Sequence, residues 1–367
     1  MINMSNNELE EYIRSLLRYT LVNDSDQTNE YDVRVTGNNI YIIPIMPTTF
    51  IIDEVLYDKA YNALSIGLAP YLTVIKGLAM EIATFPNQDI TQQRGLVFHF
   101  YEGQPQRYIC SMTNLIQQYH KSHLIPLMKQ MNWDYINFPG AIVSGNSGSG
   151  KSYFLKTIFT LCSIAGETIV IDPKTSDLAR MTRNRKATKA IIPDFSSHIR
   201  QGIGSHFLSR IVDELKQLEA EMYDRQQKLF EQSKKISTDY RELGVKPIFL
   251  FIDELAALTT GANRQIRQDF LDTLTRLAVL GRESGLYLIL SLQSARAEFV
   301  PDIIRQQLSL KVLLGRINKQ TAQFLFPELM EAPAIPLGGK GTGIVSISGD
   351  PRFSGIQPIA TPTILED

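Results

Sequence analysis

The chain has 367 residues, of which 44% are hydrophobic and 20% are charged, and its 37 basic and 38 acidic residues give a formal net charge of −1. This composition is ordinary for a globular protein, and the length suggests two domains. The near-neutral charge argues against a protein that coats nucleic acid by bulk charge, but a ring of subunits can line a basic channel with a few cations from each subunit.

Neither a membrane-spanning segment nor a secretion signal is visible in the sequence. The longest apolar stretch, residues 63–85, contains Lys76 and Glu81, so it lacks the ~18 uncharged residues that a membrane span needs. The N-terminus turns acidic without a basic segment followed by an apolar one. Cys110 and Cys162 have no metal-ligand spacing and form no disulfide framework, and the five histidines form no cluster. We therefore expect a cytoplasmic protein with no intrinsic membrane span.

Residues 1–132 differ from the rest of the chain in their sequence pattern, and they contain no recognisable catalytic or ligand-binding motif. Apolar residues at helical spacing begin the region, and alternating residues around a Gly-Asn-Asn turn follow. The predicted elements are a helix at 7–21, strands at 31–35 and 40–45, a helical region at 54–85, a strand at 95–101 and a helix at 113–131. We expect a small α/β or α+β module with a partner or assembly role.

Residues 133–367 alternate apolar strands with helical segments. The strand candidates lie at 141–144, 168–171, 248–252, 286–291 and 310–314. A long charged helix is predicted over residues 208–237. This alternation is typical of a parallel α/β sheet with right-handed crossovers.

A complete G-x-x-x-x-G-K-[ST] sequence occupies residues 145–152, between a predicted strand and a predicted helix. Its glycines let backbone N–H groups converge on an anion, and the start of the helix adds the positive end of its dipole. Lys151 is expected to bind the β- and γ-phosphates of ATP, and the Ser152 hydroxyl to bind Mg²⁺. The alternative is a chance glycine-serine turn. The predicted phosphate-binding residues are Gly145, Asn146, Ser147, Gly148, Ser149, Gly150, Lys151 and Ser152.

A second apolar strand, residues 248–252, ends in Asp253 and Glu254. An uninterrupted apolar strand is buried on both faces, as in a parallel sheet, so its acids emerge at the carboxyl edge where ligands bind. Asp253 is placed to hold Mg²⁺ through water, and Glu254 to orient or deprotonate the attacking water. The alternative is a solvated strand end without catalytic use.

Together these segments resemble the FtsK/SpoIIIE family of DNA translocases in the HerA/FtsK superfamily, and within it the coupling-protein branch of conjugative elements. The similarity spans roughly residues 133–350. It rests on the phosphate loop and on the sequences IDPK at 171–174, EAEMY at 219–223, FIDELAAL at 251–258 and GRESGLYLILSLQ at 281–293. The resemblance implies a RecA-like core and a hexameric ring that moves double-stranded DNA through its channel.

The resemblance also implies roles for residues outside the two nucleotide motifs. Gln293 would be the polar sensor of the γ-phosphate. Arg282 matches an arginine that can reach a neighbour's nucleotide, and a guanidinium supplied in trans makes hydrolysis depend on ring assembly. Arg316 is the second candidate for that role, and either arginine could instead be a surface ion-pair partner. Asp172 and Lys174 would shape the edge of the nucleotide site.

For DNA, the informative positions follow the strand that ends at Gln293. Arg305 and Lys319 fall where family members present basic residues to the phosphate backbone, and Arg296 lies two residues beyond another such position. Isolated cations in loops suit phosphate contacts that do not depend on base sequence. A second basic group could also line the channel or could be a solvated loop; it comprises Arg180, Arg183, Arg185, Lys186 and Lys189.

Our interpretation is an α/β protein: residues 1–132 form a small N-terminal module, and residues 133–367 form a RecA-like P-loop ATPase motor. It would hydrolyse ATP with Mg²⁺ to move DNA for a mobile element, in conjugative transfer or replication. The expected partners, besides DNA and further copies of the chain, are a relaxase, a replication protein or a transfer-apparatus protein. Two alternatives remain open: the motor of a protein-secretion system, and a nucleotide-gated adaptor with little turnover.

Overall fold

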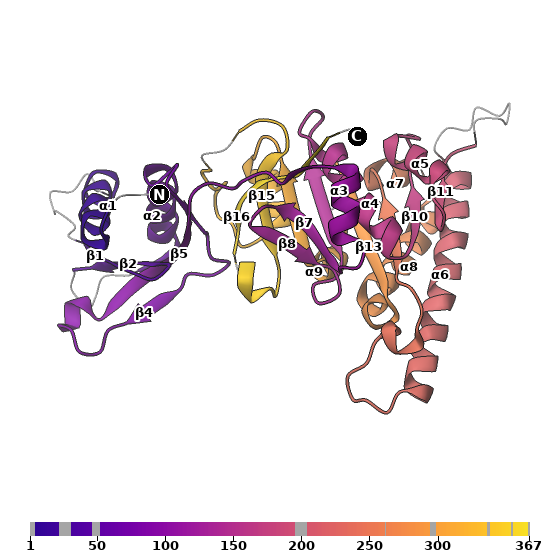
Figure 1. Ribbon diagram of the computed structural model, residues 1–367, viewed down its shortest axis with the longest axis horizontal. Helices are drawn as coiled ribbons and strands as arrows, with labels where there is room; N and C mark the ends of the chain where they lie inside the picture. Colours follow the sequence, from indigo (N-terminus) through magenta and orange to yellow (C-terminus); the bar gives the residue numbers. More distant parts are fainter. Residues whose placement is uncertain are drawn as a thin grey trace.

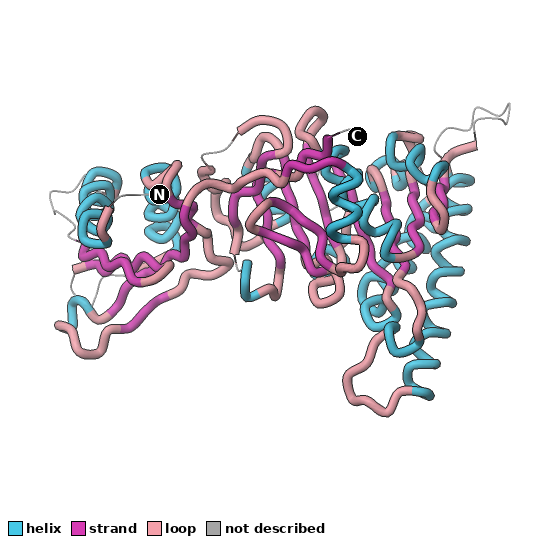
Figure 2. Tube along the Cα trace, in the orientation of Figure 1, coloured by secondary structure: helices cyan, strands magenta, loops and turns pink. Residues whose placement is uncertain are grey.

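The computed structural model describes residues 4–21, 31–45, 52–194, 204–260, 262–293, 299–335, 338–353 and 355–365. Two parts lie side by side along the chain's long axis, a small N-terminal module and a larger part built around a long sheet (Figure 1). In the small module the helices stand on one side of the strands (Figure 2). Within the described ranges, no helix combines the length and apolar character that a membrane span needs.

The N-terminal module is an antiparallel sheet in the order β1-β2-β5-β3, with β4 also paired to β5, covered by two helices. Its elements are α1 (Asn6–Thr20), β1 (Tyr31–Thr36), β2 (Asn39–Pro44), α2 (Glu54–Gly67), β3 (Leu72–Val74), β4 (Ile82–Thr84), a 3-10 turn (Ile90–Gln92) and β5 (Arg94–Glu102). A capping box starts α1: the Ser5 hydroxyl accepts the N–H of Glu8, and the Glu8 carboxylate accepts the N–H of Ser5. Buried residues of both helices and of the sheet, including Ile13, Tyr61 and Phe98, form one core.

Two of the predicted helices in this region were too long. The helical region expected at 54–85 ends with α2 at Gly67, and β3 and β4 follow it. The helix expected at 113–131 is only α3 (Met112–Tyr119), after which β7 (Leu124–Met128) and β8 (Met131–Asp134) form a hairpin. In both places a strand partner overrides local helical spacing, because pairing and burial decide the state of a short apolar run.

The larger part contains an eight-stranded sheet in the order β11-β10-β12-β13-β9-β14-β15-β16. The strands from β11 to β14 in this order run parallel, and β15 and β16 add antiparallel pairs at one edge. Its strands are β9 (Ala141–Gly145), β10 (Glu167–Ile171), β11 (Thr188–Ile191), β12 (Ile248–Ile252), β13 (Leu286–Leu292), β14 (Leu310–Leu314), β15 (Thr342–Ile347) and β16 (Gln357–Ala360). The five strands predicted from the sequence are confirmed, and β11, β15 and β16 were missed.

Helices connect these strands and cover both faces of the sheet. They are α4 (Lys151–Ala165), α5 (Asp177–Met181), α6 (Ser205–Gln232), α7 (Leu255–Thr259), α8 (Arg264–Ser284), α9 (Asp302–Gln307) and α10 (Lys319–Leu325), with 3-10 turns at Thr182–Asn184, Tyr240–Leu243 and Pro351–Phe353. Alternate strand residues enter two cores: Leu250 packs with α6 and α8, whereas Phe249 and Phe251 pack with α4. Burial on both faces explains why these strands read as uninterrupted apolar runs.

The division between the two parts lies near Gly103, before the position expected from the sequence. The predicted boundary at residue 132 falls inside β8. Leu115 of α3 and Trp133 of β8 belong to the same core as Phe154 of α4. In addition, β6 (Ile109–Ser111) pairs in parallel with β17 (Thr363–Leu365) at the other end of the chain. Residues 105–134 therefore pack as part of the larger domain.

The N-terminal module contacts the larger domain through α2 and β3. The hydroxyl of Ser65 donates to the carbonyl of Ala334 at 2.8 Å, and the side-chain oxygen of Asn62 accepts the N–H of Ala334 at 3.2 Å. Just after β3, Lys76 and Ile356 exchange backbone hydrogen bonds of 3.0 and 2.7 Å. These contacts fix the module beside the segments that precede β15 and β16.

Candidate nucleotide site

The predicted phosphate loop connects the end of β9 to the start of α4. Gly148 and Gly150 have φ values of +79° and +96°, a left-handed backbone that favours glycine. A Cβ at Gly150 would also lie only 2.6 Å from the backbone nitrogen of Gly341. The loop is held by the N–H of Gly341, which donates to the carbonyl of Ser149 at 2.6 Å. Among the described residues the buried hydroxyl of Ser149 has no hydrogen-bond partner, as expected of a group that awaits a ligand.

Lys151 is the first residue of α4, and its ammonium lies beneath the loop among polar groups of the sheet. Its Nζ donates to the Ser291 hydroxyl at 2.7 Å and lies 3.8 Å from Asp253 Oδ1. Only 8% of the Lys151 side chain and 15% of the Asp253 side chain are exposed. Burial lowers the pKa of Lys151, and the nearby carboxylates of Asp253 and Glu254 oppose that shift. This is a positive charge held in a poorly solvated position, where it acts strongly on an anion.

Ser291 joins the two charged residues of this group. Its hydroxyl accepts from Lys151 and donates to Asp253 Oδ1 at 2.7 Å. The sequence analysis did not single out Ser291. The available signal was a hydroxyl side chain near the end of the otherwise apolar strand β13, where a buried polar group needs partners.

Asp253 and Glu254 follow β12 at the carboxyl edge of the sheet, as predicted. Glu254 has the left-handed backbone angles φ 53° and ψ 62°, and its side chain is almost fully buried. Lys174 Nζ lies 2.9 Å from Glu254 Oε2, and the backbone N–H of Gln293 points to Oε1 at 3.5 Å. The side chain of Gln293 itself is exposed at the end of β13. The structure thus brings Lys151, Asp253, Glu254 and Gln293 to one edge of the sheet.

An open cavity of about 690 Å³ lies against the phosphate loop. One wall is the loop itself at residues 146–149, and the other walls are residues 315–317 and 338–340. Arg316 and Lys340 are both exposed and line this cavity. The guanidinium of Arg107 donates to the carbonyls of Lys340 and Thr361 and so fixes the far wall. Arg316 therefore lies beside the phosphate loop of its own chain.

The residues present fit a Mg²⁺-bound nucleoside triphosphate. The unpartnered hydroxyl of Ser149, the buried ammonium of Lys151 and the left-handed glycines form a cradle for phosphate oxygens. Ser152 is exposed in the first turn of α4, and Ser152 and Asp253 are the residues that would hold Mg²⁺, an ion that prefers oxygen ligands and neutralises phosphate charge. No cluster of three or more His, Cys, Asp or Glu suited to another metal occurs in the described ranges.

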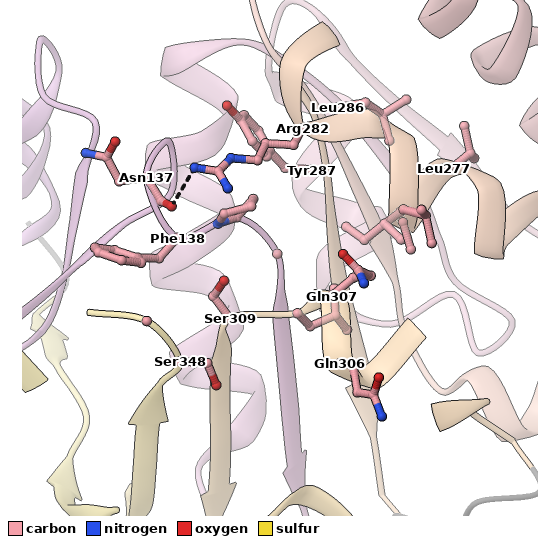
Figure 3. A pocket seen from close by; sticks show the side chains of 17 residues that line it. Asn137, Phe138, Leu277, Arg282, Leu286, Tyr287, Gln306, Gln307, Ser309 and Ser348 are labelled. Carbon is pink, nitrogen blue, oxygen red and sulfur yellow. Dashed lines mark hydrogen bonds between the residues drawn. The ribbon is translucent and has the colours of Figure 1, made fainter. Parts of the chain in front are cut away.

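Arg282 lies away from this cluster, near the C-terminal end of α8. Its Nη2 donates to the carbonyl of Asn137 at 3.3 Å, in a cavity of about 500 Å³ that Phe138 and the start of β13 also line (Figure 3). The chain enters β9 just after Asn137 and leaves β9 into the phosphate loop. Arg282 therefore lies at the amino edge of the sheet, where it cannot reach the phosphate loop of its own chain.

The three residues expected to contact DNA differ in their positions in the structure. Only 7% of Arg305 is exposed. Its guanidinium donates to the Phe324 carbonyl and to Asp302, and it lies over the Phe324 ring. The prediction that Arg305 presents its charge to DNA is corrected accordingly: the side chain is a structural link between α9 and α10. Lys319 is exposed and forms a 2.8 Å ion pair with Glu331, a solvated contact that is easily exchanged. Arg296 lies outside the described residues.

The second basic group forms mostly local contacts. Arg180 pairs with Asp177 at 3.4 Å, and Lys189 pairs with Glu214 of α6. Arg185 donates to Ser163 at 2.9 Å, and burial lowers its pKa. These contacts fit the interpretation of this segment as a solvated and locally paired surface at the β11 edge.

A phosphate loop between β9 and α4, with acidic residues at the carboxyl end of β12 in the same parallel sheet, defines the fold as that of the P-loop nucleotide-binding proteins. Residues 122–297 match the FtsK/SpoIIIE family, and the chain thus carries an FtsK/SpoIIIE domain. The prediction of an FtsK/SpoIIIE domain in this region is confirmed, and so is the predicted α/β fold.

Two curated relatives share this region. The chain is 29% identical over 211 residues to the FtsK domain-containing protein YdcQ of Bacillus subtilis (strain 168), covering 57% of this chain and 41% of that protein. It is 29% identical over 175 residues to the DNA translocase FtsK of Tropheryma whipplei (strain TW08/27), covering 46% of this chain and 23% of that protein. The chain thus spans less than half the length of either relative.

A solved structure matches nearly the whole fold. The monomer form of the pCW3 conjugation coupling protein TcpA with ATPγS has a TM-score of 0.55, 17% identity and coverage of 96% of this chain and 94% of its own. At this identity the match establishes the fold alone.

Proposed function

We propose that this chain is an ATP-driven DNA translocase that works as a hexameric ring and serves a mobile element in conjugative transfer or replication. ATP hydrolysis is supported most directly by the contacts of Lys151 with Ser291 and Asp253 under the phosphate loop. Glu254 lies beside this group. Support for DNA as the substrate comes from the FtsK/SpoIIIE domain and from a relative named DNA translocase FtsK. The fold match to a conjugation coupling protein supports the role in transfer.

In the proposed reaction, a water oxygen attacks the γ-phosphorus of ATP and the bond from that phosphorus to the β–γ bridging oxygen breaks. The carboxylate of Glu254 orients the water and accepts its proton. Lys151 binds the β- and γ-phosphates, and its buried ammonium stabilises the negative charge that moves toward the leaving group. Gln293 lies two residues after Ser291, just past the end of β13, where its exposed amide would respond to the presence of the γ-phosphate.

Assembly is part of the proposal because the site of one chain lacks Arg282. Arg282 lies at the amino edge of the sheet, and in the proposed ring it would face the nucleotide of a neighbouring subunit. A guanidinium from the neighbour would stabilise the transferring phosphoryl group and couple turnover to assembly. Exposed Lys319 is then the remaining described candidate for a phosphate contact to DNA.

The proposal is tested by ATP hydrolysis measured with duplex DNA, with single-stranded DNA and with an unfolded peptide, at several salt concentrations. Stimulation by duplex DNA that weakens with salt is the expected result, because phosphate contacts release counterions. The Glu254→Gln variant controls for contaminating ATPases. Stimulation by the peptide alone would favour the motor of a secretion system. Slow hydrolysis indifferent to every addition would favour a nucleotide-gated adaptor.

A further inference from the structure

The loop that follows β10 contacts both acidic residues at the end of β12. Lys174 Nζ lies 2.9 Å from Glu254 Oε2, and the Ser176 hydroxyl lies 3.3 Å from Asp253 Oδ2. The two strands pair in parallel, with Ile171 opposite Ile252, so their carboxyl ends bring the loop and the acids together. This contact involves a side chain to which the roles described above assign no chemical step.

The backbone of this loop is built around Asp172, which is fully buried. One carboxylate oxygen of Asp172 accepts the N–H of Lys174 at 2.9 Å, and the other accepts the N–H of Ser176 at 2.6 Å and its hydroxyl at 2.7 Å. Thr175, between them, has φ 53°, a left-handed backbone that is strained for a residue other than glycine. The hydrogen bonds of Asp172 hold that conformation, and the direction of Lys174 is fixed with it.

A cation lies beside the buried carboxyl group of Glu254. That carboxylate is buried, and an ionised carboxylate out of water is costly unless it is paired and hydrogen-bonded. The left-handed backbone of Glu254 sets the direction of its side chain, and Lys174 contacts the end of that side chain. The Lys174 side chain is 42% exposed, whereas the Lys151 side chain is buried under the phosphate loop.

We propose that Lys174 is a positioning residue that holds the carboxylate of Glu254 in the orientation that faces the attacking water. The inference rests on the proposed ATP hydrolysis, and it adds no contact between Lys174 and nucleotide. Asp172 acts one step further away, because it fixes the loop that carries Lys174. The charged groups in this small region influence one another. Burial and the ammonium of Lys174 lower the pKa of Lys151, whereas the carboxylates of Asp253 and Glu254 raise it.

The test compares Lys174→Met, which keeps the stem without the charge, with Lys174→Arg, which restores a cation. Basal ATPase activity without DNA and the Kd of a fluorescent ATP analogue are measured for both. Lys174→Met is expected to lower kcat by about tenfold, because a misplaced general base loses part of its effect, and to change Kd by less than about twofold. Lys174→Arg should recover part of kcat. The matched control is Lys228→Met, which removes an exposed lysine paired with Asp224 on α6.

Two results would overturn the positioning role. If Lys174→Met raises Kd as much as it lowers kcat, Lys174 binds phosphate instead. If Lys174→Met turns over as fast as the wild type or faster, the pair with Glu254 is dispensable or restraining. Failure of the DNA proposal shows separately, because these measurements contain no DNA. A wild-type protein no more active than Glu254→Gln would remove the hydrolysis on which both proposals rest.

Discussion

Arg282 and Lys151 lie at opposite edges of the same parallel sheet. Lys151 begins α4 after the carboxyl end of β9, whereas Arg282 bonds to the Asn137 carbonyl ahead of the amino end of β9. A catalytic contribution of Arg282 to ATP hydrolysis must therefore come from a neighbouring subunit. Arg316 lines the cavity beside its own phosphate loop and is the candidate for a contact within one subunit.

We predict that Arg282→Ala lowers ATP turnover without changing the Kd for nucleotide or the unfolding temperature of the isolated chain. The arginine is exposed and makes one 3.3 Å hydrogen bond, so the fold loses little. Mixing Arg282→Ala with Glu254→Gln subunits should restore part of the activity, since some interfaces then combine an intact arginine with an intact glutamate. Undiminished turnover of Arg282→Ala would exclude the trans role. A parallel Arg316→Ala variant separates the two arginines, because it should weaken nucleotide binding.

Lys151→Ala and Glu254→Gln should fail in different ways. Removing the buried ammonium should abolish nucleotide binding, because Lys151 contacts ATP in the ground state as well as in the transition state. Glu254→Gln should bind ATP and stop turnover, because the carboxylate acts on the water only as the reaction proceeds. Binding measured by fluorescence anisotropy and hydrolysis measured by phosphate release distinguish the two. Equal loss of ATP affinity in both variants would remove Glu254 from the catalytic role.

Gly150→Ala is expected to destabilise the nucleotide-free protein more than Gly148→Ala. Both glycines have positive φ, so both substitutions add backbone strain, but a Cβ at Gly150 would also meet Gly341 at 2.6 Å while a Cβ at Gly148 has open space. The expected difference in the free energy of unfolding is on the order of 1–3 kcal/mol, the usual cost of overpacking. Urea unfolding of the two variants provides the measurement. Equal stability would show that the loop at Gly341 moves aside freely.

The central strands and the site they carry could be predicted because two independent patterns agree there. Uninterrupted apolar runs located β9, β12, β13 and β14, and the motifs at residues 145–152 and 253–254 follow two of these strands. Residues 72–74 were misread as helix because their strand partner, β5, lies farther along the chain, where local spacing does not show it. Residues 124–128 were misread because their apolar run was counted into the preceding helix, although their partner β8 follows directly in a hairpin.

Ser291 and Arg305 show a second limit of the sequence. A single serine in a strand and a single arginine in a helix carry no pattern, and only the folded arrangement shows that Ser291 joins Lys151 to Asp253. In the same way, only the structure shows that the guanidinium of Arg305 donates hydrogen bonds to the Phe324 carbonyl and to Asp302 within the domain. A resemblance to a family shows which residue type is present at a position, but it does not show the direction or the contacts of the side chain.

Arg305→Ala should behave as a stability variant. The substitution removes hydrogen bonds to the Phe324 carbonyl and to Asp302, together with the contact over the Phe324 ring. It leaves the buried Phe324 carbonyl without that donor, at a cost of about 1–3 kcal/mol in the free energy of unfolding. Chemical unfolding tests this value. An unchanged stability together with weakened DNA binding would return Arg305 to the channel.

Lys319→Ala should weaken DNA binding without affecting the fold or basal ATP hydrolysis. The lysine is exposed at the start of α10, and its ion pair with Glu331 is solvated and contributes little to stability. If Lys319 contacts a DNA phosphate, its removal lowers affinity about equally for unrelated sequences and reduces the slope of log affinity against log salt by about one unit for each subunit engaged. Lys228→Ala, which removes another exposed and paired lysine far along α6, is the control and should leave both quantities unchanged. An unaltered affinity and salt slope in Lys319→Ala would mean that DNA binds elsewhere on the chain or not at all, and DNA-stimulated hydrolysis by the same variant decides between these two outcomes.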